Sequence, residues 1–327
     1  MRTAILGAGS WGTALAIHAH RAGHEVLLWG RDARVTSAIR ETRRHPRRLS
    51  GVEIPEGVSA TSDLNQAFEF SNTVLLAVPC ASLRSVLDGA PSGLRARRFV
   101  STAKGIEPET LKRMSEVIRQ AFPEAPVAAL SGPTFADGVA RGEPSAAVIA
   151  DSGEGLAVEI QESFSTAQLR LYSSDDLVGV ELAGALKNVI AIAAGIVTGL
   201  GYGHNTLAAL VTRGLAEIAR VVRSQGGKER TIHGLAGVGD LMLTCTGQQS
   251  RNRRVGEEIG KGRRLSDVLV EMPEVAEGAR TCLAVPTMAA RAGVEAPIAE
   301  AVVSVLYEMA EPRATVERLM TRALRAE

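Results

Sequence analysis

A glycine-rich turn near the start of the chain constrains the fold more than any other part of the sequence. Gly7, Gly9 and Gly12 follow the spacing GxGxxG, after a short apolar strand-like run and before a helix-like stretch. In this position the turn lets backbone approach a dinucleotide pyrophosphate, and the N–H groups at the helix start face the phosphates. The pattern predicts a doubly wound α/β domain that binds a dinucleotide through this turn, including Ser10 and Trp11.

The first half of the chain alternates apolar runs with helix-like stretches, which predicts a parallel sheet covered by helices. The runs interpreted as strands are 2–6, 25–29, 73–78, 99–102, 127–130 and 146–150. From about Asp175 the chain changes to long Ala- and Leu-rich segments with helical periodicity. With 327 residues the chain exceeds one hydrophobic core. We therefore predict a Rossmann-type nucleotide-binding domain over 1–174 and an all-α substrate domain over 175–327.

Composition argues against several classes of protein. Lys plus Arg number 37 and Asp plus Glu 36, so the net charge gives no reason to expect nucleic acid or an anionic membrane as a partner. Three scattered cysteines do not form a disulfide framework or a zinc motif, and no arrangement of His, Asp, Glu and Cys suggests a metal. The most apolar stretch, 182–200, contains Lys187 and Asn188, so we expect a buried core helix and no membrane insertion. Without a leader-like segment after Met1, we expect a cytoplasmic protein.

The end of the second predicted strand bears on the choice of cofactor. An acidic residue about 20 positions after the glycine turn commonly binds the ribose hydroxyls of NAD. Here the chain reads Trp29-Gly30-Arg31-Asp32. Arg31 could pair with the 2′-phosphate of NADP, which favours NADP, whereas Asp32 keeps NAD possible. The arginine-rich segment 40–48 is either a solvated loop or a group that acts near the cofactor.

Lys187 is the residue best suited to proton transfer. It is the only cationic side chain between Glu181 and Arg213, and its surroundings in the sequence are strongly apolar. Desolvation or a neighbouring cation would lower the pKa of its ammonium group toward neutrality, where a lysine can donate and accept protons. The alternative is a lysine that forms a salt bridge or extends its ammonium group to solvent.

Two further positions can bind charged ligand groups. Lys104 follows an apolar run, which places it at the carboxyl edge of a sheet, where doubly wound folds bind ligands. Ser250-Arg251-Asn252 stand at the start of a predicted helix that Ser250 can cap. Free N–H groups, a guanidinium and an amide at a helix start form a site for an anion such as phosphate.

Several separated segments together resemble the bacterial NAD(P)-dependent glycerol-3-phosphate dehydrogenase family. They are 7–15, 29–31, 103–105, SGPTFA at 131–136, KNV at 187–189, GVGDL at 237–241 and SRNRR at 250–254. One departure concerns His45-Pro46-Arg47-Arg48-Leu49-Ser50-Gly51, where family members usually carry something like NxxYLPG. Arg48 therefore replaces an aromatic residue near the cofactor. A second departure is Gly138, where the family tends to have Glu.

The resemblance implies an enzyme that interconverts sn-glycerol 3-phosphate and dihydroxyacetone phosphate with NAD or NADP, and that supplies glycerol 3-phosphate for phospholipid synthesis as a homodimer. Lys187 would be the general acid and base. The implied substrate contacts are Lys104, Gly132, Thr134, Lys187, Asn188, Asp240, Ser250, Arg251 and Asn252. The implied cofactor contacts are Gly7, Gly9, Ser10, Trp11, Gly12, Arg31, Arg48, Lys104, Ala136, Arg251, Val275 and Glu277. Asp240 could alternatively serve as a turn or capping residue.

Two other functions share some of these features. A 3-hydroxyacid or 6-phosphogluconate type dehydrogenase also joins a nucleotide-binding domain to a helical one and uses a lysine; the residues around Lys187, Asp240 and Arg251 distinguish the two. A redox sensor that binds NAD(P)H without turnover would keep the glycine turn, but it would not need that second set of residues.

Overall fold

The computed structural model describes residues 1–92, 94, 97–272 and 276–323. The chain divides into two compact units. The first consists of Met1–Ala103 and Lys112–Val180, and the second of Lys104–Leu111 and Glu181–Glu327. The second unit thus takes a short segment from within the sequence of the first.

The first unit is built on a twisted eight-stranded sheet with the strand order β10-β9-β8-β5-β4-β1-β2-β3. Its strands are β1 (Arg2–Leu6), β2 (Glu25–Trp29), β3 (Val58–Thr61), β4 (Thr73–Leu76), β5 (Arg98–Ser101), β8 (Val127–Ser131), β9 (Ser145–Ala150) and β10 (Leu169–Ser174). The chain turns back in strand order between β1 and β4, so the predicted doubly wound architecture is confirmed. Strands β3 and β10, which the sequence interpretation did not include, form the two edges.

The predicted parallel arrangement is confirmed for the strands from β3 to β8 and does not extend to the last two, because β9 runs antiparallel to β8 and β10 follows β9 in parallel. The connection between the two strands, residues 132–144, contains the short helix α6 (Ala136–Arg141). After this helix the chain re-enters the sheet beside the carboxyl end of β8, where Ser131 pairs with Val148.

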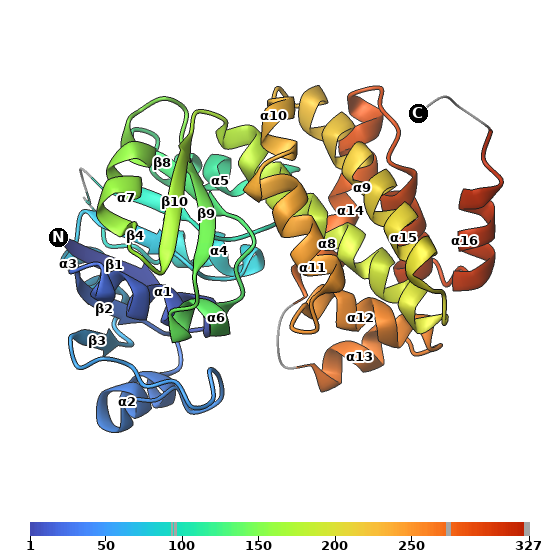
Figure 1. The fold of residues 1–327 in the computed structure, drawn as a ribbon. Coiled ribbons are helices and arrows are strands. Elements are labelled where there is room, and N and C mark those ends of the chain that lie inside the picture. Colours follow the sequence, from blue (N-terminus) through green and yellow to red (C-terminus); the bar gives the residue numbers. More distant parts are fainter. Residues whose placement is uncertain (93, 95–96, 273–275, 324–327) are drawn as a thin grey trace. The chain divides into compact units, whose positions relative to one another are not determined.

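Helices cover both faces of this sheet (Figure 1). They are α1 (Ser10–Arg21), α2 (Ala33–Thr42), α3 (Leu64–Phe70), α4 (Cys80–Asp88), α5 (Met114–Ala121), α6 and α7 (Leu156–Phe164), with the short strand β7 (Lys112–Arg113) before α5. Alternation along β1 separates the two cores: Ile5 belongs to the cluster with α1, α2, α6 and α7, whereas Ala4 and Leu6 belong to the cluster with α3, α4 and α5. Both faces of the central strands are buried, as parallel strands require.

In the part of the second unit that the structure describes, all elements are helical apart from the two-residue strand β6 (Ile106–Glu107). Its elements are α8 (Leu177–Gly199), α9 (His204–Ser224), α10 (Glu229–Ile232), η1 (Leu235–Gly239), α11 (Asp240–Thr246), α12 (Arg251–Gly260), α13 (Leu265–Glu271), α14 (Glu277–Arg291), α15 (Pro297–Tyr307) and α16 (Pro312–Met320). Helix α8 is long and apolar enough to cross a membrane, but its most apolar window is entirely buried in protein. The prediction of a core helix is therefore confirmed.

Glycines allow α8 and α12 to approach at backbone contact distance. A Cβ atom added to Gly256 would lie 2.0 Å from the carbonyl oxygen of Ile192, and one added to Gly195 would lie 2.0 Å from that of Arg253. Gly260 makes a similar contact with α8 one turn further along. This line of glycines fixes the position of α12, whose first turn carries Arg251.

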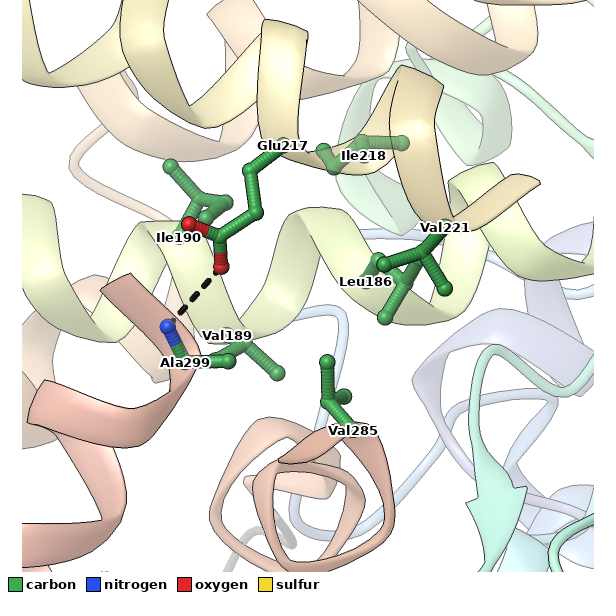
Figure 2. A pocket seen from close by; sticks show the side chains of 8 residues that line it. All are labelled: Leu186, Val189, Ile190, Glu217, Ile218, Val221, Val285 and Ala299. Atoms are coloured by element: carbon green, nitrogen blue, oxygen red, sulfur yellow. Dashed lines mark hydrogen bonds between the residues drawn. The ribbon is translucent and has the colours of Figure 1, made fainter. Parts of the chain in front are cut away.

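A buried carboxylate joins two other helices of this unit. Glu217 on α9 is 3% exposed and accepts hydrogen bonds from the backbone N–H groups of Ile298 (2.8 Å) and Ala299 (2.9 Å), at the start of α15. Figure 2 shows its carboxylate pointing to Ala299 within a small pocket. Apolar side chains surround it: Leu186, Val189, Ile190, Ile218, Val221 and Val285. Burial raises the pKa of Glu217 to about 7, and the two N–H donors oppose this rise only in part.

The pKa of Glu217 predicts how stability depends on pH. Folded protein keeps this proton after the unfolded chain has lost it, so the free energy of unfolding should fall as pH rises from about 4.5 to about 7, and then level off. A shift of this size corresponds to about 3 kcal/mol. Urea denaturation across this range should show the slope in the parent and a flatter profile in Glu217→Gln. Glu308→Gln, which removes an exposed carboxylate from the C-terminal end of α15, should keep the parent slope. An unchanged slope in Glu217→Gln would contradict the assignment.

Candidate active site

The glycine turn in the first unit has the geometry of a phosphate-binding turn. A Cβ atom on Gly12 would lie 1.9 Å from the carbonyl oxygen of Gly7. Gly7 itself has a φ of +124°, and a Cβ atom there would overlap the backbone carbonyl of Ala77. Both positions therefore require glycine for internal packing. Gly9 differs, because nothing lies within 4 Å of the place where its Cβ would stand. Gly9 is also the N-cap of α1, which has no side-chain cap. Open space beside uncapped N–H groups, including those of Ser10 and Trp11, fits a dinucleotide pyrophosphate.

The charged residues after β2 are more constrained than the sequence suggested. Asp32 is the N-cap of α2 and accepts from the backbone N–H of Arg34 at 3.0 Å. Its other oxygen accepts from the guanidinium of Arg47 at 2.6 Å. Asp32 therefore has both oxygens engaged by the protein. Arg31 is exposed beside it, and Arg48 lies half-buried on the following loop.

The arginine-rich segment is not one solvated loop. Its first part, Arg40, belongs to α2 and donates to the carbonyl of Ala60. Arg43 adopts a left-handed conformation and its guanidinium donates to the carbonyls of Ile54, Pro55 and Val58. The residues that accept these bonds lead into the edge strand β3, so the bonds hold residues 43–52 against the first unit. Of the two interpretations left open by the sequence, simple solvation does not describe this segment.

Three further residues of the predicted site also lie in the first unit. Gly132 has a φ of +142° at the end of β8, and a Cβ there would lie 2.9 Å from the Cα of Ala147. Thr134 follows in a tight turn, with its backbone N–H donating to the carbonyl of Gly132 at 2.8 Å. Ala136 is the first residue of α6. Val275, another predicted cofactor contact, lies outside the described residues.

In the second unit, one carboxylate holds two lysines. The Nζ atom of Lys187 donates to Oδ1 of Asp240 at 2.8 Å, and the Nζ atom of Lys104 donates to Oδ2 of the same group at 2.6 Å. Lys187 comes from the middle of α8, Asp240 from the first turn of α11, and Lys104 from the segment that joins this unit out of sequence. Side chains of Lys187 and Asp240 are 8% and 2% exposed. The sequence therefore predicted the residues, and the fold brings all three together.

Burial sets the charge state of this cluster. Desolvation, together with the neighbouring charge of Lys104, lowers the pKa of Lys187 to about 8, although Asp240 opposes the change. For Asp240 the two ammonium groups outweigh burial and lower the pKa of its carboxyl group below the ordinary value. Lys187 is consequently an ammonium group near neutral pH that can lose its proton at moderate cost. A lysine in this state can serve as a general acid and as a general base.

Thr244 completes the surroundings of Lys187 and was missed by the sequence interpretation. Its hydroxyl oxygen accepts from the Nζ atom of Lys187 at 2.6 Å, and the hydroxyl also lies 2.6 Å from the backbone carbonyl of Asp240. Thr244 follows Asp240 by four residues on α11, so helical spacing could have identified it as a neighbour on the same face. Asp240 itself is the first residue of α11, and the residues before it form the π-helical segment η1.

A row of amides connects the other predicted substrate residues. The side-chain NH₂ of Asn188 donates to the carbonyl of Lys104 at 3.0 Å, and its oxygen accepts from Asn252 at 2.9 Å. Asn252 in turn accepts from the backbone N–H of Gly278 at 3.0 Å. Glu277 accepts from the backbone N–H of Lys104 at 3.2 Å. These bonds fix Lys104, Asn188 and Asn252 relative to one another, and they leave one N–H of the Asn252 amide for a further acceptor.

The start of α12 has the predicted capping geometry. Ser250 is its N-cap, and the Ser250 hydroxyl accepts from the backbone N–H of Arg253 at 3.2 Å. Arg251 and Asn252 are the first two helical residues, with Asn252 8% exposed and Arg251 partly exposed. The Asn252 contact to Asn188 therefore places this helix start next to the residue that follows Lys187 in α8. Positive charge and directional donors are thus available close to the buried lysines.

A phosphate-binding glycine turn on a doubly wound sheet, followed by a helical unit with a buried lysine of lowered pKa, defines a dinucleotide-dependent oxidoreductase. Two family models match the chain: NAD-dependent glycerol-3-phosphate dehydrogenase N-terminus over residues 2–157, and NAD-dependent glycerol-3-phosphate dehydrogenase C-terminus over residues 176–317. The chain belongs to this family.

Individual relatives agree with the family models. The chain is 47% identical over 330 residues to a glycerol-3-phosphate dehydrogenase (NAD(P)+) of Geobacter sp. (strain M21), a match that covers 100% of this chain and 98% of the relative. It is 45% identical over 336 residues to the enzyme of that name from Acidobacterium capsulatum, covering 100% and 99%. A solved structure of glycerol-3-phosphate dehydrogenase from Coxiella burnetii is similar with a TM-score of 0.92 and 35% identity, covering 98% of this chain and 99% of that chain.

Proposed function

We propose that the chain interconverts sn-glycerol 3-phosphate and dihydroxyacetone phosphate by hydride transfer, with the proton moved by Lys187. The observation that carries this proposal is the buried cluster of Lys187, Asp240 and Lys104 in a member of the glycerol-3-phosphate dehydrogenase family. The cluster puts a titratable ammonium group and a second fixed positive charge at one place. A ketone that is being reduced needs both a proton for its oxygen and stabilisation of the negative charge that develops there.

The pyrophosphate of the cofactor would bind to the first unit. The open space at Gly9 and the N–H groups at the start of α1 fit the pyrophosphate, which supports the assignment of Gly7, Gly9, Ser10, Trp11 and Gly12. When bound, the nicotinamide ring supplies or accepts the hydride. We assign further contacts to Arg31, Arg48, Lys104, Ala136, Arg251, Val275 and Glu277. With both oxygens of Asp32 engaged by Arg34 and Arg47, the site favours NADPH over NADH.

Proton transfer and most of the substrate contacts fall to residues of the second unit. Arg251 and the free N–H of the Asn252 amide would hold the substrate phosphate at the start of α12. Lys187 donates its proton to the carbonyl oxygen during reduction and recovers one from the hydroxyl during oxidation. Asp240 and Thr244 hold the Nζ atom of Lys187 in place, and Lys104 adds positive charge. Gly132 and Thr134 are assigned as further substrate contacts, and Asn188 fixes Lys104 and Asn252.

Family membership supports several wider proposals. We propose that residues 1–174 act as the cofactor domain and residues 175–327 as the substrate domain. We further propose a cytoplasmic homodimer that supplies glycerol 3-phosphate for phospholipid synthesis. Light scattering of the purified protein would test the dimer by its mass.

The activity itself is tested by following NADPH and NADH oxidation at increasing concentrations of dihydroxyacetone phosphate. We expect saturable reduction of dihydroxyacetone phosphate and little reduction of dihydroxyacetone, since the latter lacks the phosphate. A 3-hydroxyacid and 6-phosphogluconate serve as controls in the direction of oxidation. Turnover of either control in place of glycerol 3-phosphate, or cofactor binding without any turnover, would contradict the proposal.

The phosphate site makes a separate prediction. Arg251→Ala should raise the KM for dihydroxyacetone phosphate about 10- to 100-fold, because a charge-assisted contact to a dianion is lost, while the affinity for NADPH should change much less. Arg254→Ala is the matched control, since Arg254 lies on the same helix but is exposed, and its KM should equal that of the parent. Steady-state kinetics measures both. Equal KM values for Arg251→Ala and the parent would place the phosphate elsewhere.

A further inference from the structure

The loop 43–52 is bound to the phosphate-binding turn through a buried histidine. His45 is 7% exposed, and its Nε2 atom lies 2.9 Å from the backbone carbonyl oxygen of Ala8, between Gly7 and Gly9. Its Nδ1 atom lies 3.2 Å from the backbone nitrogen of Arg47. A backbone N–H can only donate, so Nδ1 is the acceptor, and Nε2 carries the proton that is donated to Ala8. One neutral imidazole therefore holds both the turn and the loop.

Charge and burial keep this imidazole in its neutral form. Burial lowers the pKa of His45, and the positive charges of Arg48 and Arg47 lower it further. The loop has additional anchors at both ends: the guanidinium of Arg43 holds the segment before β3, and Arg141 donates to the carbonyl of Ser50 at 2.8 Å. Every contact lies within the first unit. The backbone at Arg47 is thereby fixed relative to the turn that would hold the pyrophosphate.

From this fixed position, the side chain of Arg47 forms an ion pair with Asp32. The guanidinium of Arg47 and the carboxylate of Asp32 are 2.6 Å apart, and their side chains are 65% and 42% exposed. Asp32 stands at the end of β2, where a free carboxylate would accept hydrogen bonds from ribose hydroxyls and repel a phosphate. Because the other Asp32 oxygen caps α2, both oxygens already accept a hydrogen bond, and the charge of this carboxylate is paired with that of Arg47.

We propose that His45 and Arg47 determine the cofactor preference of this enzyme, Arg47 by neutralising Asp32 so that a 2′-phosphate is accepted, and His45 as the positioning residue that holds Arg47 over the turn. The inference rests on the proposed dinucleotide site. It explains why an acidic residue at the end of β2 does not commit the chain to NAD. It also gives the arginine-rich loop a function, whereas a contact between Arg31 and the 2′-phosphate would by itself leave that loop without one.

The test measures binding of NADP+ and NAD+ to the purified protein by calorimetry. Arg47→Ala should weaken NADP+ binding about tenfold, because an exposed carboxylate then faces a group of charge near −2, and should change NAD+ binding less than about twofold. Arg44→Ala removes an equal charge from an exposed position of the same loop and should keep the parent ratio of the two dissociation constants. In the Asp32→Asn/Arg47→Ala double variant, NADP+ binding should return most of the way, because Asn can still cap α2.

Variants of His45 separate positioning from direct contact. Gln places an amide NH₂ near the position of Nε2 and should keep the bond to Ala8, whereas Ala removes it. His45→Ala should lower the preference for NADP+ and speed hydrogen exchange of the loop amides in the protein without cofactor; His45→Gln should stay near the parent in both. Arg47→Ala should alter the binding ratio without changing exchange, because it leaves the His45 bond to Ala8 intact.

Three outcomes would overturn the inference: equal affinity of the parent for NAD+ and NADP+, an unchanged ratio in Arg47→Ala, or a double variant as weak as Arg47→Ala. Parallel assays with dihydroxyacetone phosphate keep the two proposals apart. A parent that binds NADP+ selectively but does not reduce this substrate would refute the proposed activity and leave the inference standing. A parent that reduces it while the ratios stay unchanged would refute only the inference.

Discussion

Lys187→Ala should lower turnover of dihydroxyacetone phosphate by about 10² to 10⁴ if only proton transfer is lost. The loss should be larger if the ammonium group also stabilises the developing alkoxide. Steady-state kinetics should place the effect on kcat more than on KM, because Arg251 and Asn252 remain to hold the phosphate. Lys261→Ala, which removes an exposed lysine from the same unit, should behave as the parent.

The structure indicates that this variant will fold. Removing one partner of a buried ion pair usually leaves an uncompensated charge, but Asp240 keeps its bond to Lys104 when Lys187 is replaced. Cofactor binding should also persist, since the glycine turn belongs to the first unit. A folded Lys187→Ala protein that binds NADPH and retains turnover near that of the parent would refute the role, and Lys104 would become the alternative proton donor.

The pH dependence of the parent tests the same residue. With the pKa of Lys187 near 8, reduction needs the ammonium form and should decline above about pH 8. Oxidation of glycerol 3-phosphate needs the neutral amine and should rise through the same range. If the rate of reduction falls and the rate of oxidation rises around the same pH value, a single titrating group serves both directions of the reaction. Two limbs with the same sign would point to a different titrating residue.

Gly256→Ala should destabilise the protein by about 3 kcal/mol or more, because the new methyl group would overlap a backbone carbonyl of α8 that cannot move independently. The direction of the change in stability distinguishes a crowded site from an open one. Alanine has a helix propensity about 1 kcal/mol better than glycine, so the same substitution at an open helical site would stabilise the protein. Urea denaturation of the parent and variant measures the difference, which should appear as a lower midpoint.

The matched control for Gly256 is Gly203→Ala. Gly203 precedes α9 with a φ of −85°, and nothing lies within 4 Å of the place where its Cβ would stand. Its substitution should change the free energy of unfolding by less than about 1 kcal/mol. If Gly256→Ala folds at all, displacement of α12 should raise the KM for dihydroxyacetone phosphate, since Arg251 moves with the helix. Parent-like stability would show that α8 and α12 can separate at low cost.

The sequence predicted the elements whose local signals agree. Strands β1 and β2 were predicted to the residue, because the glycine turn lies between them and apolar residues dominate both. Edge strands β3 and β10 were missed, since β3 has only four residues and since polar residues separate and follow the apolar ones in β10. The antiparallel direction of β9 was also missed, because the alternation of residues along a strand does not show in which direction its neighbour runs.

In the candidate site too, local sequence patterns identified residues, whereas contacts between residues far apart in the sequence could not be predicted. Lys187 could be identified from its isolation among apolar residues, and Ser250 from capping preference. The bonds from Lys104 and Lys187 to one carboxylate join residues that are far apart in the sequence, 136 and 53 positions respectively. Likewise, the contact between His45 and Ala8 spans 37 positions. Such contacts exist only after the chain has folded, so the sequence could not show them.

Lys104 sets a limit on how this protein can be divided or recombined. It reaches Asp240 from a segment that the ribosome completes long before the helices of its own unit have been made. A fragment cut at the apparent domain boundary near residue 175 would contain Lys187, Asp240 and Thr244, but not the second cation or the backbone carbonyl that orients Asn188. A chimaera that exchanges the helical half between relatives would therefore have to exchange residues 104–111 as well.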